Sequence, residues 1–156
     1  MPLVIRPYAQ EDFATLHAID AECYAPEIAY SRRTMRSFLR LPGSECLVAE
    51  ENGNIAGFIL TDRYGPAGHI ITLDVAPAAR RRGVGTALVE AAHASLARAG
   101  VREVELETST VNATAGAFWM KHGYEARGVL PNYYENGEDA YWMTRGIPGR
   151  SKGKDE

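Results

Sequence analysis

The stretch Ile70-Ile71-Thr72-Leu73-Asp74-Val75-Ala76-Pro77-Ala78-Ala79-Arg80-Arg81-Arg82-Gly83-Val84-Gly85 joins an apolar run to a glycine-containing turn. All of its first six residues except Asp74 are β-branched or apolar, and they predict a buried strand that is closed by Pro77. Beyond the turn, apolar residues recur at every fourth position and predict a helix that ends near Gly100. These residues are Val84, Leu88, Ala92 and Leu96.

The segment 80–85 has the features of a loop that binds a phosphate group. The first N–H groups of a helix lack partners within the helix and carry a partial positive charge. Glycines let an anion approach the backbone closely, and arginines add charge-assisted hydrogen bonds. A glycine-softened helix start beside a solvated basic patch would explain Gly-x-Gly alone. The preceding strand, the following helix and three arginines together favour a phosphate site.

Two common phosphate motifs are absent from this segment. No Gly-Lys-Ser/Thr follows, so the pattern is not a P-loop. The dinucleotide fingerprint Gly-x-Gly-x-x-Gly is incomplete as well, because Leu88 stands where its third small residue belongs.

Outward from this segment, the hydrophobic pattern predicts the element order β-α-α-β-β-β-α-β-α-β-β. One β-α-β crossover over residues 70–108 is combined with hairpins, which predicts an α/β fold. The other signals are a strand at 3–5, a helix with Phe13, Leu16, Ile19 and Cys23 on one face, a helix capped by Ser31, a hairpin at Asn52-Gly53, a turn at 65–68, an alternating strand at 103–108, a helix from Asn112 to about Gly123, and strands near 124–130 and 139–145.

The overall composition is that of an ordinary globular domain. The chain has 156 residues, of which 46% are hydrophobic and 24% charged, and this fits one domain. A formal net charge of −3 argues against a dedicated nucleic-acid binder. The chain has no apolar run long enough to span a membrane, no signal peptide and no metal motif around Cys23 or Cys46. We therefore expect a cytoplasmic protein without a metal.

The motif Arg80-x-x-Gly83-x-Gly85 resembles the Arg/Gln-x-x-Gly-x-Gly/Ala signature of the GNAT superfamily of acyl-CoA N-acyltransferases. The resemblance covers nearly the whole chain and extends to the RimI-type branch, which acetylates protein N-terminal amines, including a ribosomal protein's N-terminal alanine. Further matching residues are Ile5-Arg6-Pro7, Glu11-Asp12, Leu73-Asp74-Val75-Ala76-Pro77, Leu106-Glu107, Asn112, Tyr133-Tyr134, Glu138-Asp139-Ala140 and Met143.

This resemblance implies a GNAT domain over residues 1–147 and a disordered tail at 148–156. The expected fold is a central mixed seven-stranded sheet with about four helices, in which the fourth and fifth strands splay apart. It also implies acetyl-CoA as cosubstrate, although a longer acyl donor stays possible. The residues expected to bind it are Leu73, Asp74 and Val75 through the backbone, Arg80, Arg81, Arg82, Gly83, Val84, Gly85 and Thr86 around the pyrophosphate, and Asn112 through its side chain, which can also cap a helix.

Glu107 is the general base that the resemblance implies, acting through water. Its alternative role is that of a solvated carboxylate, since Glu103 and Glu105 lie on the same face of the strand. The family's general-acid tyrosine is replaced by Trp119, whose indole donates a hydrogen bond but cannot deliver a proton. Solvent, Tyr133 or Tyr134 can protonate the thiolate instead, and Trp119 can simply pack in the helix.

The acceptor amine is expected between residues 22–30 and residues 133–139. Tyr24, Ile28 and Tyr30 would form an apolar mouth, Tyr133 and Tyr134 would bind the acceptor backbone, and Glu22 or Glu27 would attract the ammonium group. Ordinary loop packing and solvated acids explain each of these residues equally well. The four histidines, His17, His69, His93 and His122, are predicted not to cluster, and none is assigned to catalysis.

The predicted reaction is direct acetyl transfer to an amine without a covalent enzyme intermediate. An α-amine has a pKa near ~8 and a lysine side chain near ~10.4, so a protein N-terminus is the preferred acceptor. A small-molecule amine, a lysine side chain and a non-catalytic acyl-CoA-binding module remain as alternatives. The protein is expected to be a monomer or homodimer.

Overall fold

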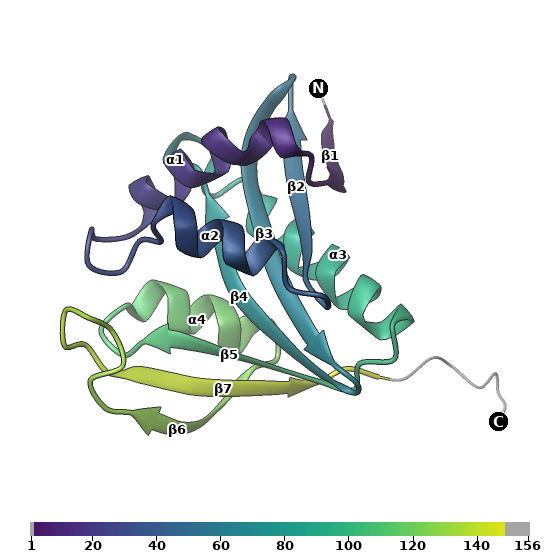
Figure 1. Cartoon of the computed structure of the whole chain (residues 1–156). Helices are drawn as coiled ribbons and strands as arrows, with labels where there is room; N and C mark the ends of the chain where they lie inside the picture. The colour runs from purple at the N-terminus through teal and green to yellow at the C-terminus, as the bar shows by residue number, and fades with distance from the viewer. Residues whose placement is uncertain (1, 149–156) are drawn as a thin grey trace, which may run out of the picture.

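A computed structural model describes residues 2–148 and places seven strands in one sheet with helices on both faces (Figure 1). All neighbouring strands are antiparallel except β4 and β5, which are parallel. The predicted order of elements and the mixed seven-stranded sheet are confirmed. In spatial order the strands are β1 (Leu3–Pro7), β2 (Glu45–Glu51), β3 (Asn54–Tyr64), β4 (Ala67–Val75), β5 (Glu103–Ser109), β7 (Ala140–Gly146) and β6 (Glu125–Leu130).

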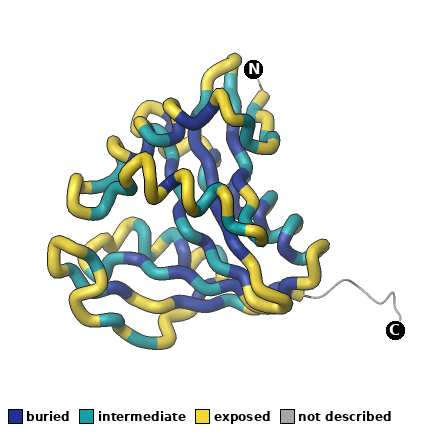
Figure 2. Tube along the Cα trace, viewed as in Figure 1, coloured by how far each residue is buried: buried dark blue, intermediate teal, exposed yellow. Residues whose placement is uncertain are grey.

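The sheet separates two hydrophobic clusters, and its central strands are buried along most of their length (Figure 2). Helices α1 (Phe13–Cys23) and α2 (Arg32–Leu39) pack on one face, and α3 (Val84–Arg98) and α4 (Ala113–Lys121) on the other. Alternation along β3 divides its side chains between the two clusters: Phe58 and Leu60 join α1 and α2, whereas Ile59 joins α3. Short 3-10 turns, η1 (Gln10–Asp12) and η2 (Pro77–Ala79), precede α1 and follow β4.

Local signals in the sequence determine several element boundaries. Ser31 Oγ accepts a hydrogen bond of 3.1 Å from Thr34 N and caps α2, as predicted. The turn between β2 and β3 has φ of 56° at Asn52 and 80° at Gly53, which confirms the predicted two-residue hairpin.

The turn between β3 and β4 is shorter than the predicted one at 65–68. Only Gly65 and Pro66 form it, while Ala67 and Gly68 already belong to β4. Gly68 pairs with Arg63 on one side and with Val104 on the other. A Cβ atom on Gly68 would lie 3.1 Å from Val101 Cγ1, so the glycine serves close packing in the strand.

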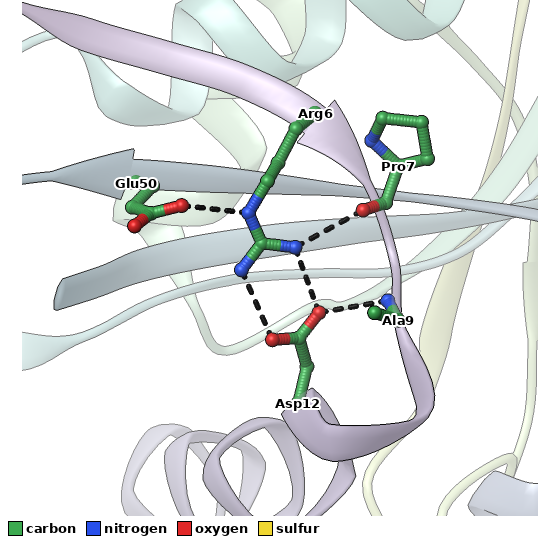
Figure 3. Close-up of polar contacts among 5 residues, drawn as sticks. All are labelled: Arg6, Pro7, Ala9, Asp12 and Glu50. Carbon is green, nitrogen blue, oxygen red and sulfur yellow. Dashed lines mark hydrogen bonds and ion pairs between the residues drawn. The ribbon is translucent and has the colours of Figure 1, made fainter. Parts of the chain in front are cut away.

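Arg6 joins the first strand to the start of α1 (Figure 3). Its Nη1 and Nη2 donate to the two carboxylate oxygens of Asp12 at 2.8 and 3.0 Å, and its Nε donates to Glu50 Oε1 at 2.6 Å. The hydrogen bond from Arg6 lowers the pKa of Asp12, so that this carboxyl stays ionised. The contacts fix α1, and the loop that follows it, relative to β1 and β2.

The described chain ends just beyond β7. Ile147 is buried, and its N–H bonds to Arg102 O at 2.8 Å, so residue 147 belongs to the folded domain. The tail predicted at 148–156 falls, from residue 149 onward, outside the described residues. Within residues 2–148, no helix is both long and apolar enough to cross a membrane.

Candidate active site

The sheet opens where β4 and β5 separate. The two parallel strands pair only from Ala67 to His69 and from Glu103 to Glu105, although β4 continues to Val75 and β5 to Ser109. Figure 1 shows the strands close together at one end and diverging toward the other. The predicted splay of the fourth and fifth strands is therefore confirmed.

The separation leaves one edge of β4 without a strand partner. Ala76 N donates to Ala56 O in β3, so by alternation Val75 and Leu73 direct their backbone groups away from β3. Side chains reach this edge: Leu73 O lies 3.4 Å from Tyr24 Oη, and Val75 O lies 3.2 Å from Arg80 Nε. The predicted cofactor residues Leu73 and Val75 thus lie on the open edge.

Asp74 does not share that orientation, which corrects its assignment as a backbone ligand of the cofactor. It is opposite Phe58 in the β3 register, and alternation turns its backbone groups toward β3. Its carboxyl group is fully buried and accepts a hydrogen bond of 2.6 Å from Thr72 Oγ1.

Glu107 and His69 meet at the point where the strands part. His69 Nε2 lies 2.8 Å from Glu107 Oε1, with 35% of the histidine side chain and 19% of the glutamate side chain exposed. The register explains the contact: His69 is opposite Glu105, and Glu107 is two residues further along the same face of β5. The pair combines a carboxylate with a titratable ring at the mouth of the cleft.

The environment of His69 favours its protonated form. Burial of the ring lowers its pKa, but the hydrogen bond and the charge of Glu107 raise it by more, and Glu105 and Asp62 add to this effect. The pKa of His69 therefore lies above its ordinary value. The raised pKa favours the imidazolium form, which donates to the Glu107 carboxylate.

Tyr133 and Tyr134 bring the β6–β7 connection to the same place. Their rings pack edge to face with centroids 4.9 Å apart. Burial raises the pKa of Tyr133, and the charge of Glu107 and a hydrogen bond to it raise that pKa further. Burial is the main cause that raises the pKa of Tyr30, and the nearby phenol groups of Tyr133 and Tyr134 raise it further. The structure thus brings together Tyr30, Tyr133, Tyr134 and Glu107.

The other predicted acceptor residues are arranged around this cluster less directly. Tyr24 turns its hydroxyl toward the β4 backbone, and Ile28 is half-buried in the loop after α1. Glu22 and Glu27 are exposed. Their predicted interaction with an ammonium group therefore rests on charge and has no support from a contact.

The loop before α3 has the backbone shape expected of an anion site. Arg81 and Gly83 both have positive φ, of 67° and 83°, and α3 begins at Val84 without a side-chain cap on its first N–H groups. A Cβ on Gly85 would come within 3.4 Å of the Phe118 ring in α4, so the first turn of α3 packs closely on that helix. The free N–H groups and the positive helix end fit a phosphate group.

The three arginines of the loop have different partners. Arg80 donates to Val75 O and, from Nη2, to Cys23 Sγ at 3.4 Å. Arg82 forms an ion pair of 2.7 Å with Glu51. Arg81 is exposed at a left-handed position. Among the described residues, Arg81 is the one arginine of this loop that can bind an anion without first breaking a contact within the protein.

Two further predicted residues lie along α4. Asn112 is exposed, and its Oδ1 accepts from Ala115 N at 3.0 Å, which confirms its capping role and leaves its cofactor contact a prediction. Trp119 is buried, with its ring edge to face against Phe118 at 5.0 Å and Tyr124 at 5.4 Å. This packing accounts for the tryptophan without a catalytic role.

Two of the histidines lie near one arginine. Arg145 Nη1 donates to the backbone oxygen of His122 at 2.9 Å and lies 3.2 Å from His93 Nδ1, whereas the His122 ring lies 3.2 Å from Thr86 Oγ1. Burial and the charge of Arg145 lower the pKa of His93 to about 4, which keeps this ring neutral. Tyr124 Oη lies 2.7 Å from His93 Nε2. These residues therefore form a packing network between α3, α4 and β7.

His69 is the site residue that sequence reasoning missed. It was placed only as a residue preceding a buried strand, because its partner is 38 positions away. Alternation along both strands would have put it on the face of Glu107 only if the β4–β5 register had been known.

Comparison with known proteins matches this geometry to one family. The model of the Acetyltransferase (GNAT) family matches residues 13–124. An uncharacterized N-acetyltransferase of Methanocaldococcus jannaschii is 31% identical over 147 residues, which cover 94% of this chain and 93% of the relative.

Two solved structures resemble the whole fold. The ribosomal-protein-S18-alanine N-acetyltransferase from Escherichia coli superposes with a TM-score of 0.87 at 25% identity, over 99% of this chain and 100% of that one. The NatC complex bound to Gag peptide and CoA gives a TM-score of 0.81 at 27% identity, over 95% of this chain and 100% of the matched chain.

Proposed function

Because the chain belongs to the GNAT acetyltransferase family and is an N-acetyltransferase, we propose that its acceptor is the N-terminal α-amine of a protein and its donor acetyl-CoA. The observation that carries the proposal is the Glu107–His69 pair, 2.8 Å apart, at the divergence of β4 and β5. Tyr30, Tyr133 and Tyr134 border the same point and form a mouth for a peptide.

The residues for the cosubstrate are those of the loop before α3 and of the open edge of β4. The N–H groups of Val84, Gly85 and Thr86 would hold the pyrophosphate, with Arg81 as the available cation. Leu73 and Val75 would pair with the pantetheine arm. Acetyl-CoA, when bound there, supplies the acetyl group as a thioester.

Glu107 takes the proton that the amine must lose in this reaction. Amide formation requires a neutral amine, and a carboxylate at the cleft can accept a proton directly or through one water. His69 Nε2 donates to Glu107 Oε1, which orients the carboxylate. An α-amine with a pKa near ~8 needs less help than lysine near ~10.4, so the pair suits an N-terminus better.

Tyr133 has a hydroxyl group that can give up a proton to the departing thiolate, whereas the Trp119 indole cannot. Burial and the neighbouring Glu107 raise the pKa of Tyr133, which makes this hydroxyl a weak acid. The Trp119 ring is buried between Phe118 and Tyr124. Solvent is the second source, since an ordinary thiol has a pKa near ~8.5 and its thiolate needs no strong acid.

The similarity to enzymes of related fold supports a polypeptide acceptor. One resembling structure is an S18-alanine N-acetyltransferase, and another is bound to a peptide and CoA. Both match this chain over nearly its full length. The RimI-type features of the sequence, including Tyr133-Tyr134 and Glu138-Asp139-Ala140, point to the same acceptor class.

Release of CoA from acetyl-CoA tests the acceptor class. The panel is an Ala-initiated peptide, the same peptide already acetylated at its N-terminus, free lysine and a polyamine, each at several pH values. We expect release with the free peptide alone. Release with lysine or the polyamine and none with the peptide would overturn the proposed acceptor.

A further inference from the structure

Two carboxyl groups meet in the interior between α1 and β4. Asp20 in α1 and Asp74 in β4 are both fully buried, with exposed fractions of 0%. The two carboxyl groups adjoin, and their interaction is one of the causes that raise the pKa of Asp74. Within residues 2–148, Asp20 Oδ1 and Asp74 Oδ2 are the buried side-chain oxygens that have no donor among the other groups.

The second oxygen of each carboxyl group already has a donor. Asp20 Oδ2 accepts from Tyr30 N at 2.7 Å, and Asp74 Oδ1 accepts from Thr72 Oγ1 at 2.6 Å. One protonated carboxyl that donates to the other satisfies both remaining oxygens with groups that are already in place. Two adjoining ionised carboxylates without a donor between them would carry a large desolvation and repulsion cost.

We propose that Asp20 and Asp74 share one proton, and that this hydrogen bond positions the acceptor loop after α1 against β4. The proton resides on Asp74 Oδ2 and is donated to Asp20 Oδ1. The Asp20 carboxyl then accepts from two donors, the Asp74 hydroxyl and the Tyr30 N–H. The second clause, on the acceptor loop, rests on the proposed function, whereas the shared proton does not.

The groups that surround the pair support a single shared proton. Tyr24 Oη lies 3.4 Å from Thr72 Oγ1 and so extends the chain of hydrogen bonds from the loop to Asp74. The thiols of Cys23 and Cys46 and the phenol of Tyr30 also face Asp74, and each has its pKa raised by burial first and by Asp74 in addition. These groups are neutral near pH 7, and the nearest cation, Arg80, donates to Cys23 and the Val75 carbonyl.

The pair connects the cosubstrate strand to the acceptor mouth. Asp74 lies between Leu73 and Val75, whose backbone groups are on the open edge of β4. Asp20 holds the backbone of Tyr30, and the hydroxyl of Tyr30 reaches Ile71 O in β4 at 3.5 Å. Loss of the shared proton would turn this contact into a repulsion between two buried charges and release the loop.

The pair has a definite effect on stability against pH. Burial raises the pKa of Asp74 well above its usual range, and the adjoining Asp20 raises it further. In the unfolded chain, Asp74 releases its proton above the ordinary aspartate pKa near ~3.9. The folded protein still holds this proton there. The free energy of unfolding therefore falls as pH rises from that value through the folded pKa, because the unfolded state binds fewer protons there.

Infrared spectroscopy of the whole protein tests the proton directly. An ordinary aspartate is ionised at neutral pH, so the proposal predicts a protonated-carboxyl band in the wild type that disappears in Asp74→Asn. The matched control Asp62→Asn, a buried aspartate of β3 outside the pair, keeps the band. If the wild type has no protonated-carboxyl band, or if its band persists in Asp74→Asn, the shared proton is overturned, whatever the acceptor is.

Asp74→Asn also separates positioning from folding. An asparagine amide can donate to Asp20 in place of the shared proton, so this variant keeps the acceptor KM at neutral pH. At alkaline pH the wild-type acceptor KM rises relative to that of Asp74→Asn, whereas kcat changes little. Asp74→Leu, which cannot donate, raises the acceptor KM about tenfold over the wild type at neutral pH, as expected for one lost hydrogen bond to a charged group, and this ratio shrinks at alkaline pH, where the wild type also loses the bond.

The outcomes distinguish the two levels of the proposal. A band together with an acceptor KM that is equal in wild type and Asp74→Leu would retain the proton and reject the positioning role. If no peptide is acetylated at all, the proposed acceptor fails, while the infrared band and the unfolding free energies of wild type and Asp74→Asn from about pH 5 to about pH 9 still decide the shared proton.

Discussion

Glu103 and Glu107 are the same residue type on the same face of β5, and only their surroundings separate them. Glu103 is exposed, whereas Glu107 is mostly buried beside His69 and Tyr133. A carboxylate that is held in place by a histidine and a phenol at the mouth of a cleft is suited to proton transfer. The solvated alternative fits Glu103 and no longer fits Glu107.

The first prediction concerns this residue. Glu107→Gln removes the proton acceptor but keeps the shape of the side chain, so kcat should fall by about 10²- to 10⁴-fold, the usual contribution of a general base. The affinity for acetyl-CoA, measured by calorimetric titration, should stay within about twofold, because the proposed cosubstrate site is the loop before α3.

Glu103→Gln is the control for this prediction, since it removes an equal charge from the same face. Its steady-state kinetics should match those of the wild type. Unchanged kcat in Glu107→Gln across the pH range would take Glu107 out of the mechanism and leave the amine to lose its proton to solvent.

At the scale of elements, helices α2 and α4 each begin at a capping side chain, that of Ser31 and that of Asn112. α2 has only eight residues, from Arg32 to Leu39, and buries only Met35 fully. A helix this short gains little from its own hydrogen bonds, so its start must be stabilised by the cap. The helix packs under the acceptor loop through Phe38, whose ring lies edge to face with Tyr30 at 5.1 Å.

The second prediction is that Ser31→Ala destabilises this helix and with it the domain. Loss of the hydrogen bond from Thr34 N to Ser31 Oγ should lower the free energy of unfolding by about 1 kcal/mol. Urea denaturation of both proteins measures the difference. Ser37→Ala is the matched control, because Ser37 Oγ bonds Thr34 O within the same helix and caps no free N–H group, so its effect should stay within about 0.5 kcal/mol.

The result would contradict the capping argument if the two serine variants had equal stability. That outcome would mean that packing of Met35 and Phe38 alone holds α2 in place.

At the scale of the whole molecule, the candidate site is formed by several separate segments of the chain. The loop before α3, the open edge of β4, the face of β5 and the connection before β7 all contribute. A ligand that binds across these segments stabilises only the folded state and shifts unfolding by mass action.

The third prediction follows from that linkage. At a concentration one hundred times its dissociation constant, acetyl-CoA should stabilise the protein by about 2.7 kcal/mol and raise the melting temperature by several degrees. Gly85→Val should reduce this shift, because a Cβ at Gly85 lies 3.4 Å from the Phe118 ring and a branched side chain would push the first turn of α3 off α4. Thermal unfolding with and without acetyl-CoA measures both effects.

Gly128→Ala in β6 is the matched control, since its Cβ would meet only Trp142, at 4.0 Å, and the position is far along the sheet from the loop. It should keep the full shift. An undiminished shift in Gly85→Val would place the phosphate site away from the first turn of α3.

Much of the architecture could be predicted from short stretches of sequence. The hairpin at Asn52-Gly53, the cap at Ser31 and the alternation of Glu103 to Thr108 all agree with the structure. Each depends on contacts within a few residues, so the necessary information is local. The boundary at Gly68 was missed because its reason is long-range: Val101 packs against it from another segment.

Only some residues of the candidate site could be predicted from the sequence. Glu107 and Tyr133 were identified through a family resemblance, and the structure places them together. The same resemblance pointed to Asp74 as a backbone ligand, and the register with β3 turns that residue inward. His69 was left out because its partner is distant in sequence.

The sequence by itself determined the elements, their order and the phosphate loop, because these follow from periodicity and from backbone preferences at single residues. Only the tertiary structure decided which polar groups face one another. His69 meets Glu107 through the register of two diverging strands, and Asp20 meets Asp74 through the packing of α1 on β4. Such contacts depend on where whole elements pack, and side-chain pairing across the core is set by that packing rather than by any local pattern.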